Sequence, residues 1–168
     1  KLYSEWVFWF DGFSNKSSET YGTNIVEVGK CSNVEEFWGI YDAIPLINTM
    51  EMGSDLSLFR SGIKPLWEDT ENVGGGRIQI VLTNVEPELC QQYWRDILLT
   101  LIGETVPAPE CVNGAVISVR QHNRIAIWLN KNGSSKLVEI SKKLRDVIPI
   151  DGTVMYYSHD SSVEPVVC

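Results

Sequence analysis

The chain is poor in the residues on which most catalytic and metal sites depend. Its only histidines are His122 and His159, and neither belongs to a cluster of His, Asp and Glu with metal-ligand spacing. The run Gly74-Gly75-Gly76 lacks the following Lys-Ser/Thr of a phosphate-binding P-loop. These absences disfavour an enzyme, so we expect a binding protein that uses no metal ion or other cofactor.

The sequence also lacks membrane and redox signals. It contains no signal peptide and no apolar run that could span a bilayer. The four cysteines, Cys31, Cys90, Cys111 and Cys168, include no CxxC pair. We therefore expect reduced thiols, a cytoplasmic location and no membrane partner.

Basic residues are fewer than acidic ones. Fourteen Lys and Arg against 22 Asp and Glu give a formal net charge of −8. That balance argues against broad, non-specific binding to a nucleic-acid backbone, but it leaves room for a small basic pocket. Six Trp and six Tyr exceed what a core of this size requires, so we expect some of them to contact a ligand. The length fits one domain over residues 1–168, and the strand-like start suggests a missing N-terminal tail.

Hydrophobic periodicity predicts about eight strands and three helices. The predicted strands span residues 2–10, 24–28, 56–59, 77–83, 114–121, 124–129, 153–158 and 165–167. The first predicted helix begins at a capping box of Ser32 and Glu35, and the others span residues 87–101 and 135–148. Because hairpin spacing dominates, we expect an α+β fold in which a mainly antiparallel sheet carries the helices on one face and leaves the other open.

One predicted loop combines a large aromatic surface with a carboxylate. Pro65 opposes regular structure just before Trp67 and Glu68. An indole beside a carboxylate suits a flat, electron-poor ring, which stacks on the indole while its edge donates hydrogen bonds to the carboxylate. By itself the pair fits equally well a core anchor next to a solvated charge. Asp69, the next residue, is interpreted as part of the loop structure and not as a ligand contact.

Arg120 and Arg124 flank a short polar stretch that should join two strands. If the two arginines face each other across this hairpin, their like charges require a counter-ion. A phosphate chain would supply it, since a guanidinium binds phosphate oxygens with paired hydrogen bonds. Two solvated turn arginines are the alternative interpretation.

Two further positions are candidates for aromatic contacts. Tyr21 follows a polar loop and gains interest only as a second stacking partner beside Trp67. Phe37 and Trp38 are adjacent on the first predicted helix and point about 100° apart. One of them is therefore a candidate anchor for a partner protein, and the alternative is that both lie in the core.

Seven blocks stand in a specific order and spacing along the chain. They are WVFWF at 6–10, VEEFW at 34–38, SLFRSGIKPLWED at 57–69, GGR at 75–77, LLTLIGE at 98–104, GAVISVR at 114–120 and IAIW at 125–128. In this order they resemble the translation initiation factor 4E family, whose members bind the 5′ cap of mRNA. The resemblance covers nearly the whole chain and implies a curved antiparallel sheet with three helices on its convex face.

The resemblance implies a site for the 7-methylguanine base of the cap. Tyr21 and Trp67 match the two aromatic positions that sandwich the base. Glu68 matches the carboxylate that accepts hydrogen bonds from the guanine edge, and Trp128 matches the tryptophan beside the methyl group. The expected nucleic-acid partner is capped mRNA, represented by 7-methyl-GTP.

At the phosphate end, the resemblance implies three basic residues. Arg120 and Arg124 match the pair that holds the cap phosphates, and Arg77 matches a further basic residue that supports them. These assignments give the arginines of the predicted hairpin a common ligand.

The resemblance also implies a docking surface for a partner protein on the helices. Val34 and Trp38 on the first helix, with Leu99 and Gly103 on the second, match a groove that receives a helix with the motif Tyr-x-x-x-x-Leu-Φ. The expected partners are a 4G-type scaffold or a 4E-binding protein, and the chain itself is expected to be a monomer.

Three positions depart from the family pattern. Tyr21 stands where the main initiation factors have Trp, and a phenol offers less stacking area than an indole. Ile78 stands where many members have Trp, and the segment at 159–166 is shorter than the usual phosphate-side loop. These departures put the affinity for the cap and part of the phosphate contacts in question.

Three functions remain open from the sequence. The first is a cap-binding factor that recruits a scaffold and promotes translation initiation, and the second is a 4E-homologous repressor that binds the cap without recruiting the scaffold. The third is a carbohydrate- or small-ligand-binding module that uses exposed Trp side chains.

Overall fold

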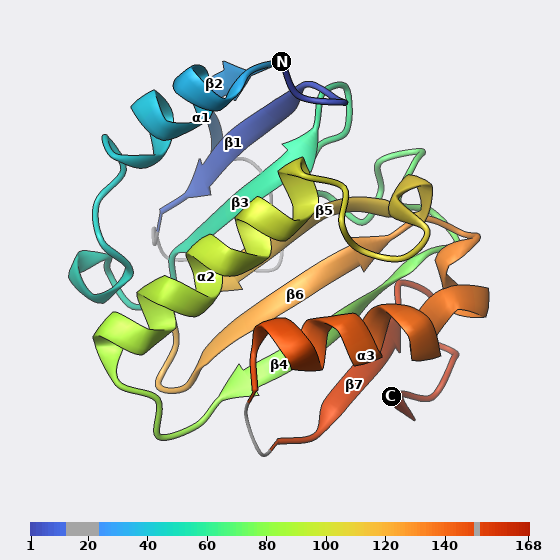
Figure 1. The fold of residues 1–168 in the computed structure, drawn as a ribbon. Coiled ribbons are helices and arrows are strands. Elements are labelled where there is room, and N and C mark those ends of the chain that lie inside the picture. The colour runs from blue at the N-terminus through green and yellow to red at the C-terminus, as the bar shows by residue number, and fades with distance from the viewer. Residues whose placement is uncertain (13–23, 150–151) are drawn as a thin grey trace.

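Eight strands form one antiparallel sheet, and the helices cover one of its faces (Figure 1). The computed structural model describes residues 1–12, 24–149 and 152–168. The strands lie in the spatial order β2-β1-β3-β5-β6-β4-β7-β8. Their bounds are β1 Trp6–Asp11, β2 Ile25–Cys31, β3 Asp55–Arg60, β4 Gly76–Leu82, β5 Val112–Ser118, β6 Asn123–Leu129, β7 Val154–Ser158 and β8 Val166–Val167. The α+β fold predicted from the sequence is confirmed.

Three α-helices and three short 3₁₀ helices complete the described part of the fold. They are α1 Val34–Tyr41, α2 Pro87–Ile102, α3 Leu137–Val147, η1 Ile47–Thr49, η2 Pro109–Cys111 and η3 Gly133–Lys136. The core lies between the sheet and these helices. On α2, the side chains of Trp94, Ile97 and Leu98 are completely buried, and each contributes roughly 1.5–3 kcal/mol of hydrophobic stabilisation.

Alternation along β4 separates the two faces of the sheet. Ile78, Ile80 and Leu82 are buried on the helical face, as the sequence pattern predicts. Arg77 and Gln79 point the opposite way and are half-buried. The face without helices, called the open face below, therefore carries polar and charged side chains on β4, whereas β5 and β6 contribute the apolar Val116, Ala126 and Trp128 to it.

The start of α1 differs from the predicted capping box by one residue. The N-cap is Asn33, whose Oδ1 accepts a hydrogen bond from the Glu36 backbone N–H at 2.9 Å. Glu36 reaches back and accepts from the Ser32 backbone N–H at 2.8 Å. Hydrogen bonding to the carboxyl, first from the Ser32 backbone and then from Asn33, lowers the pKa of Glu36. Because Asn and Ser both cap helices well, the sequence alone does not decide between them.

Other element boundaries also differ from the prediction. The predicted strands at 2–10 and 24–28 lie at Trp6–Asp11 and Ile25–Cys31. The predicted third helix begins at 135, but residues 133–136 form η3, and α3 begins at Leu137. The predicted strand at 114–121 lies at 112–118 instead. It ends there because the Val119 N–H bonds to the Ser54 carbonyl, outside the strand ladder.

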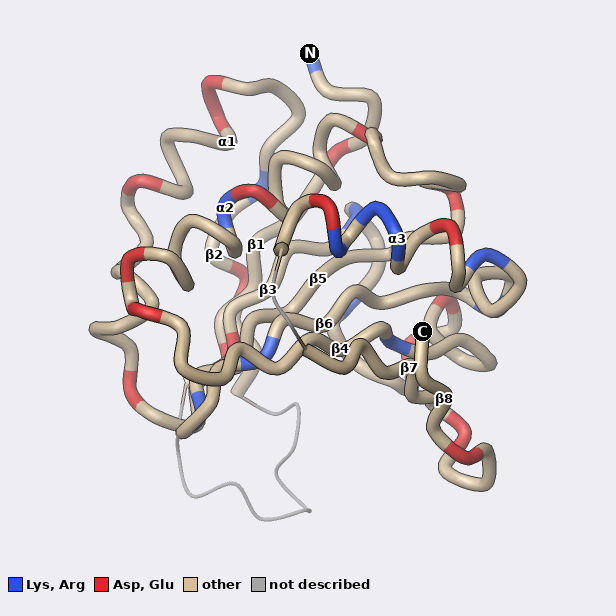
Figure 2. The backbone as a smooth tube through the Cα atoms, turned by 60° about the horizontal axis from the view of Figure 1, so that its bottom comes forward, with Lys and Arg blue, Asp and Glu red and all other residues tan. Residues whose placement is uncertain are grey.

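No helix within the described ranges is long and apolar enough to cross a membrane. Among the same residues, no group of three His, Cys, Asp or Glu side chains could hold a metal ion. Acidic residues are distributed over most of the molecule, including Asp160 and Glu164 in the segment between β7 and β8 (Figure 2).

Candidate functional site

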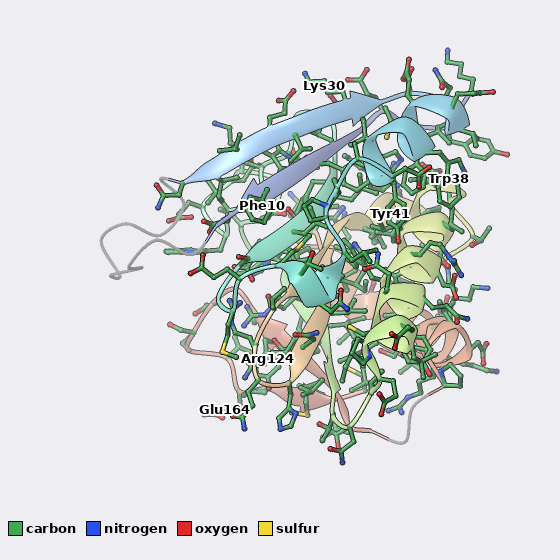
Figure 3. The ribbon with its side chains drawn as sticks, turned by 90° about the vertical axis from the view of Figure 1, so that its left-hand side faces the viewer. Phe10, Lys30, Trp38, Tyr41, Arg124 and Glu164 are labelled. Atoms are coloured by element: carbon green, nitrogen blue, oxygen red, sulfur yellow. The ribbon has the colours of Figure 1, made fainter. Side chains whose placement is uncertain are left out.

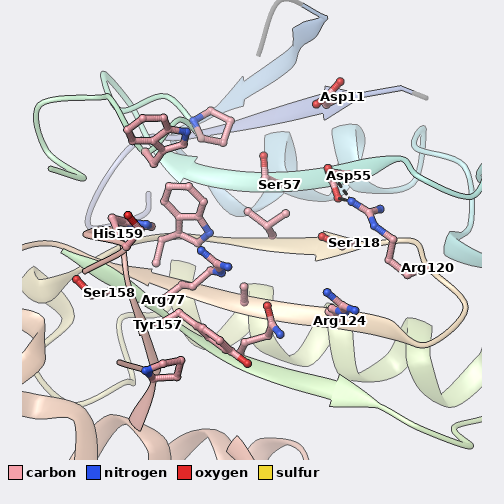
Figure 4. A pocket seen from close by; sticks show the side chains of 18 of the residues that line it. Asp11, Asp55, Ser57, Arg77, Ser118, Arg120, Arg124, Tyr157, Ser158 and His159 are labelled. Atoms are coloured by element: carbon pink, nitrogen blue, oxygen red, sulfur yellow. Dashed lines mark hydrogen bonds and ion pairs between the residues drawn. The ribbon is translucent and has the colours of Figure 1, made fainter. Parts of the chain in front are cut away.

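The open face of the sheet holds a pocket of about 680 Å³ (Figure 4). Strand register explains which side chains meet there. Trp128 on β6 pairs with Arg77 on β4, and Arg124, four residues earlier, pairs with Ser118 on β5. Because side chains alternate along a strand, Trp128 and Arg124 both point to this face, at opposite ends of the pocket. The structure thus brings together Trp67, Trp128, Arg77, Arg120 and Arg124, which all line the pocket.

Trp67 lies at the rim of the pocket, in the loop between β3 and β4. Its side chain is 51% exposed although Pro65, two residues earlier, is buried. Glu68 is exposed and is not among the described residues that line the pocket. An indole held half in solvent offers a free face to a planar ligand, so the core-anchor interpretation of Trp67 does not hold. Tyr21 lies outside the described residues, so its position as a second stacking partner stays a prediction.

Trp128 forms the floor of the pocket beside an aromatic cluster. It is 6% exposed and packs edge-on against Phe59, with ring centroids 5.5 Å apart. Its ring also contacts His159, at a centroid separation of 4.4 Å. Much less of Trp128 than of Trp67 is therefore available to a ligand.

His159 is a pocket residue that the sequence gave no reason to select. Its backbone N–H bonds to the Gly75 carbonyl, and its buried Nε2 has no hydrogen-bond partner among the described residues. Burial, and then the nearby charge of Arg77, lower the pKa of His159 to about 4. The imidazole is therefore neutral at pH 7 and adds no positive charge to the pocket.

Arg120 and Arg124 do not face each other across the hairpin. Arg124 pairs with Ser118, while Arg120 lies in the turn and binds Asp55 on β3 (Figure 4). Arg120 Nη2 lies 3.0 Å from Asp55 Oδ1, and its Nη1 donates to the carbonyls of Ser54 and Val119 at 3.1 and 2.9 Å. The counter-ion that the sequence argument assigned to a bound phosphate is thus present in the protein itself.

Arg124 and Arg77 remain available to a ligand. Neither makes an ion pair with any residue in the described parts of the chain. The guanidinium of Arg77 lies over the Tyr157 ring, 5.2 Å from its centroid. This stacking orients the side chain toward the pocket without neutralising it.

The pocket also carries acidic groups that the sequence analysis did not anticipate. Among its described lining residues, Asp11, Asp55 and Glu164 match the three arginines in number. Asp11 and Asp55 are direct cross-strand neighbours on β1 and β3, and Glu164 comes from the short segment before β8. No local motif connects these positions, so only the tertiary structure shows that these acidic residues and the arginines line the same pocket.

A separate apolar surface lies on the helical face. Val34 on α1 is 46% exposed and Leu99 on α2 is 37% exposed. Phe37 is fully buried, whereas Trp38 is only partly buried and lies edge-on to Tyr41, with ring centroids 5.5 Å apart. Of the two adjacent aromatic residues, Trp38 is thus the one that reaches the surface. Figure 3 shows Trp38 and Tyr41 on the helical side and Arg124 and Glu164 on the other side of the sheet.

The helical surface extends along the C-terminal turns of α2. Gly103 is exposed and forms the C-cap, where its N–H bonds to the Leu99 carbonyl. Gln91 on the same helix donates to the Tyr41 hydroxyl at 2.7 Å and accepts from the Ile47 N–H at 2.9 Å. These bonds hold α1 and η1 against α2, so the exposed side chains are presented by a fixed scaffold.

Comparisons with known proteins agree with this geometry. The family model described as "Eukaryotic initiation factor 4E" matches residues 1–166. A eukaryotic translation initiation factor 4E from Candida albicans is 37% identical, covering 96% of this chain and 80% of its own length. The corresponding factor from Xenopus laevis is 35% identical, over 94% of this chain and 76% of its own length.

Two similar solved structures are complexes, one with a partner protein and one with a cap. Caenorhabditis elegans eIF4E-3 in complex with the 4E-binding protein Mextli has a TM-score of 0.89 and 29% identity, covering 99% of this chain and 98% of that one. Ascaris suum eIF4E-3 with the m2,2,7G cap has a TM-score of 0.88 and 30% identity, covering 99% and 96%.

Proposed function

Because the chain belongs to the eukaryotic initiation factor 4E family, we propose that it binds the 7-methylguanosine cap of mRNA in the pocket on its open face. The observation that carries the proposal is the half-exposed indole of Trp67 at the rim of a pocket that also holds Arg77 and Arg124. Arg77 lies beside Trp128 at the end with the stacking surface, and Arg124 lies at the opposite end. Members of the family are cap-binding factors and not enzymes, and the proposed role requires no catalytic group.

The base end selects a methylated guanine by charge and shape. Methylation at N7 gives the ring delocalised positive charge, so stacking on Trp67 gains a cation–π contribution. A stack on one aromatic side chain contributes on the order of 1–3 kcal/mol. We assign Glu68 to the guanine edge, where its exposed carboxylate accepts hydrogen bonds from N1–H and N2–H. A charge-assisted bond of this kind also strengthens as methylation makes N1–H more acidic.

We assign the phosphates to the three arginines of the pocket, of which Arg124 and Arg120 lie at the hairpin end and Arg77 lies beside Trp128. Arg124 and Arg77 are free to donate paired hydrogen bonds to phosphate oxygens. Arg120 contributes while it stays bound to Asp55, which fixes its guanidinium but offsets its charge. Glu164 also lines the pocket and repels the phosphate chain, so we expect the phosphates to contribute less to affinity than in a strongly basic pocket.

We further propose that the exposed surface of Val34, Trp38, Leu99 and Gly103 docks the helix of a partner and that this partner is a 4G-type scaffold. A partly exposed tryptophan with exposed aliphatic neighbours is typical of an interface anchor. In this role the chain acts in the cytoplasm and promotes translation initiation. A repressor would use the same surface for a different partner, so the distinction requires a functional assay.

The cap proposal is tested by titrating tryptophan fluorescence with 7-methyl-GTP, GTP and a trimethylated cap analogue. We expect 7-methyl-GTP to bind at least tenfold more tightly than GTP, and Trp67→Ala to lose retention on 7-methyl-GTP resin. Equal affinities for 7-methyl-GTP and GTP, or normal retention of Trp67→Ala, would refute the assignment of the pocket.

The initiation role is tested in an extract depleted of its own cap-binding factor. Added protein should restore translation of a capped reporter, and Trp38→Ala protein should not. Protein that binds the cap but inhibits the reporter would instead identify a repressor.

A further inference from the structure

Two buried asparagines lie behind the loop that carries Trp67. Asn72 is completely buried and Asn113 is 3% exposed. Asn113 Nδ2 donates to Asn72 Oδ1 and to the Glu71 carbonyl, both at 2.9 Å. Asn72 Nδ2 in turn donates to the carbonyls of Lys64 and Leu66, at 2.9 and 2.8 Å. The pair therefore bonds to backbone on both sides of Trp67.

A β-bulge directs Asn113 toward this loop. Residues Val112 and Gly114 both pair with β6, to Leu129 and Trp128, and the register shifts between them at Asn113. The extra residue of a bulge is left outside the ladder and its side chain is re-aimed. Asn113 thus leaves the regular alternation of β5 and joins the Trp67 loop to the strand next to Trp128.

Asp69 stabilises the loop through hydrogen bonds to other residues of the same loop. Its carboxylate accepts from the Lys64 N–H at 3.0 Å and from the Glu71 N–H at 3.1 Å. At the end of the loop, Gly74 has a positive φ of 76°, and a Cβ on Gly75 would collide with the Leu129 carbonyl. Among the described strand residues, Asn113 is the one whose side chain hydrogen-bonds to the loop, and it thereby ties the loop to a strand of the pocket.

We propose that Asn72 and Asn113 are positioning residues that hold Trp67 and Glu68 in the binding geometry before the ligand arrives. Neither side chain is among the described residues that line the pocket, so neither is assigned a ligand contact. The inference rests on the proposed cap-binding function and adds the residues that preorganise its base end.

The physical argument concerns the conformations open to the loop. With 51% of its side chain exposed, Trp67 has little packing of its own to fix its position. Without the asparagine pair, the carbonyls of Lys64 and Leu66 lose their buried donors and the loop gains alternatives that satisfy them. If only a tenth of the molecules then keep the binding conformation, the apparent affinity falls tenfold.

The test compares Asn113→Ala with a matched control, Gln91→Ala. Gln91 is also a carboxamide that bridges separate segments, but it does so on the helical face. Affinities for 7-methyl-GTP and for 7-methylguanosine are measured by fluorescence, and amide hydrogen exchange of residues 62–76 is measured without ligand. Thermal unfolding confirms that each variant is folded.

We expect Asn113→Ala to lower the affinity for both ligands by about tenfold, because both bind through the base end and only that end of the pocket is affected. Exchange in residues 62–76 should accelerate, while the core strands keep their protection. Gln91→Ala should lower the unfolding temperature yet leave both affinities within twofold of wild type. If Asn113→Ala does not fold, Asn113→Ser, which keeps one donor, takes its place with the same expectation.

Unchanged affinities in a folded Asn113 variant would overturn the inference. A loss of affinity for 7-methyl-GTP without a loss of affinity for 7-methylguanosine would also overturn it. An equal loss in Gln91→Ala would also overturn it, since the effect would then follow general stability. Failure of the proposed function looks different, because the wild-type protein itself would then not distinguish 7-methyl-GTP from GTP.

Discussion

The ion pair between Arg120 and Asp55 makes the role of Arg120 in phosphate binding separable from its role in the fold. Arg120 donates to Asp55 and to two backbone carbonyls, and Asp55 is 16% exposed. Arg120→Ala removes all of these bonds and takes the guanidinium away from a largely buried carboxylate. Arg124→Ala, on the same face, removes a side chain that makes no ion pair with the described residues.

The structure sets the size of the expected effect. Two charges 3.0 Å apart attract by about 5 kcal/mol at an effective dielectric constant near 20. Desolvation of both groups and the 34% exposure of Arg120 reduce the net contribution, and hydrogen bonds to charged groups typically contribute roughly 1.5–3 kcal/mol. We therefore expect Arg120→Ala to lower the free energy of unfolding by about 2 kcal/mol, and Arg124→Ala to change it by less than about 0.5 kcal/mol.

A double-mutant cycle isolates the pair. Urea unfolding of Arg120→Ala, Asp55→Asn and the combined variant should give a coupling energy of about 1–2 kcal/mol, because Asp55→Asn removes the carboxylate charge that Arg120 attracts. In ligand titrations, Arg120→Ala should lower the affinity for 7-methyl-GTP far more than the affinity for 7-methylguanosine. Adding Asp55→Asn to that variant should recover part of the lost affinity. Additive effects on unfolding, or equal losses for both ligands, would refute this account of Arg120.

Three further predictions concern other parts of the molecule. Tyr21→Trp should tighten 7-methyl-GTP binding several-fold in a fluorescence titration if residue 21 stacks on the base, and an unchanged affinity would count against that role. Trp38→Ala should cost at least 2 kcal/mol of binding to a Tyr-x-x-x-x-Leu-Φ peptide in calorimetry while 7-methyl-GTP affinity stays constant; a loss of cap affinity would contradict the separation of the two surfaces. The folded pKa of His159, about 4, lies below its ordinary 6.5, so its contribution to stability is present above pH 6.5 and is lost as the pH falls toward 4. The free energy of unfolding, measured from pH 7 to pH 4, should show this loss. His159→Phe should make the free energy of unfolding depend less steeply on pH over this range. An unaltered dependence would show that another group is responsible.

Periodic patterns in the sequence were sufficient to predict the secondary structure and its layers. Ile78, Ile80 and Leu82 alternate on β4, and Pro87 and Gly103 mark the ends of α2 where helices commonly begin and end. The predictions failed where neighbouring residues compete for the same local role. Asn33 and Ser32 are both good helix caps, and in the structure Asn33 is the N-cap.

The candidate site was predicted only in part, because its members come from distant segments. Trp67 and Trp128 were identified through sequence blocks, and both line the pocket. His159 and Glu164 belong to a segment with no motif and reach the pocket only because β7 pairs with β4. Strand pairing between residues far apart in the chain is not encoded by any local pattern.

The sequence by itself thus determined the alternation of buried and exposed residues, the family of the chain and the residue types available to a ligand. Those properties depend on the period of a strand or helix and on residues close together in the chain. Only the tertiary structure decided that Arg120 is bound to Asp55, that acidic residues and arginines line the same pocket, and that Asn113 holds the loop of Trp67. Each of these contacts joins residues at least 40 positions apart or gathers them from several strands, so each depends on the register in which the strands meet.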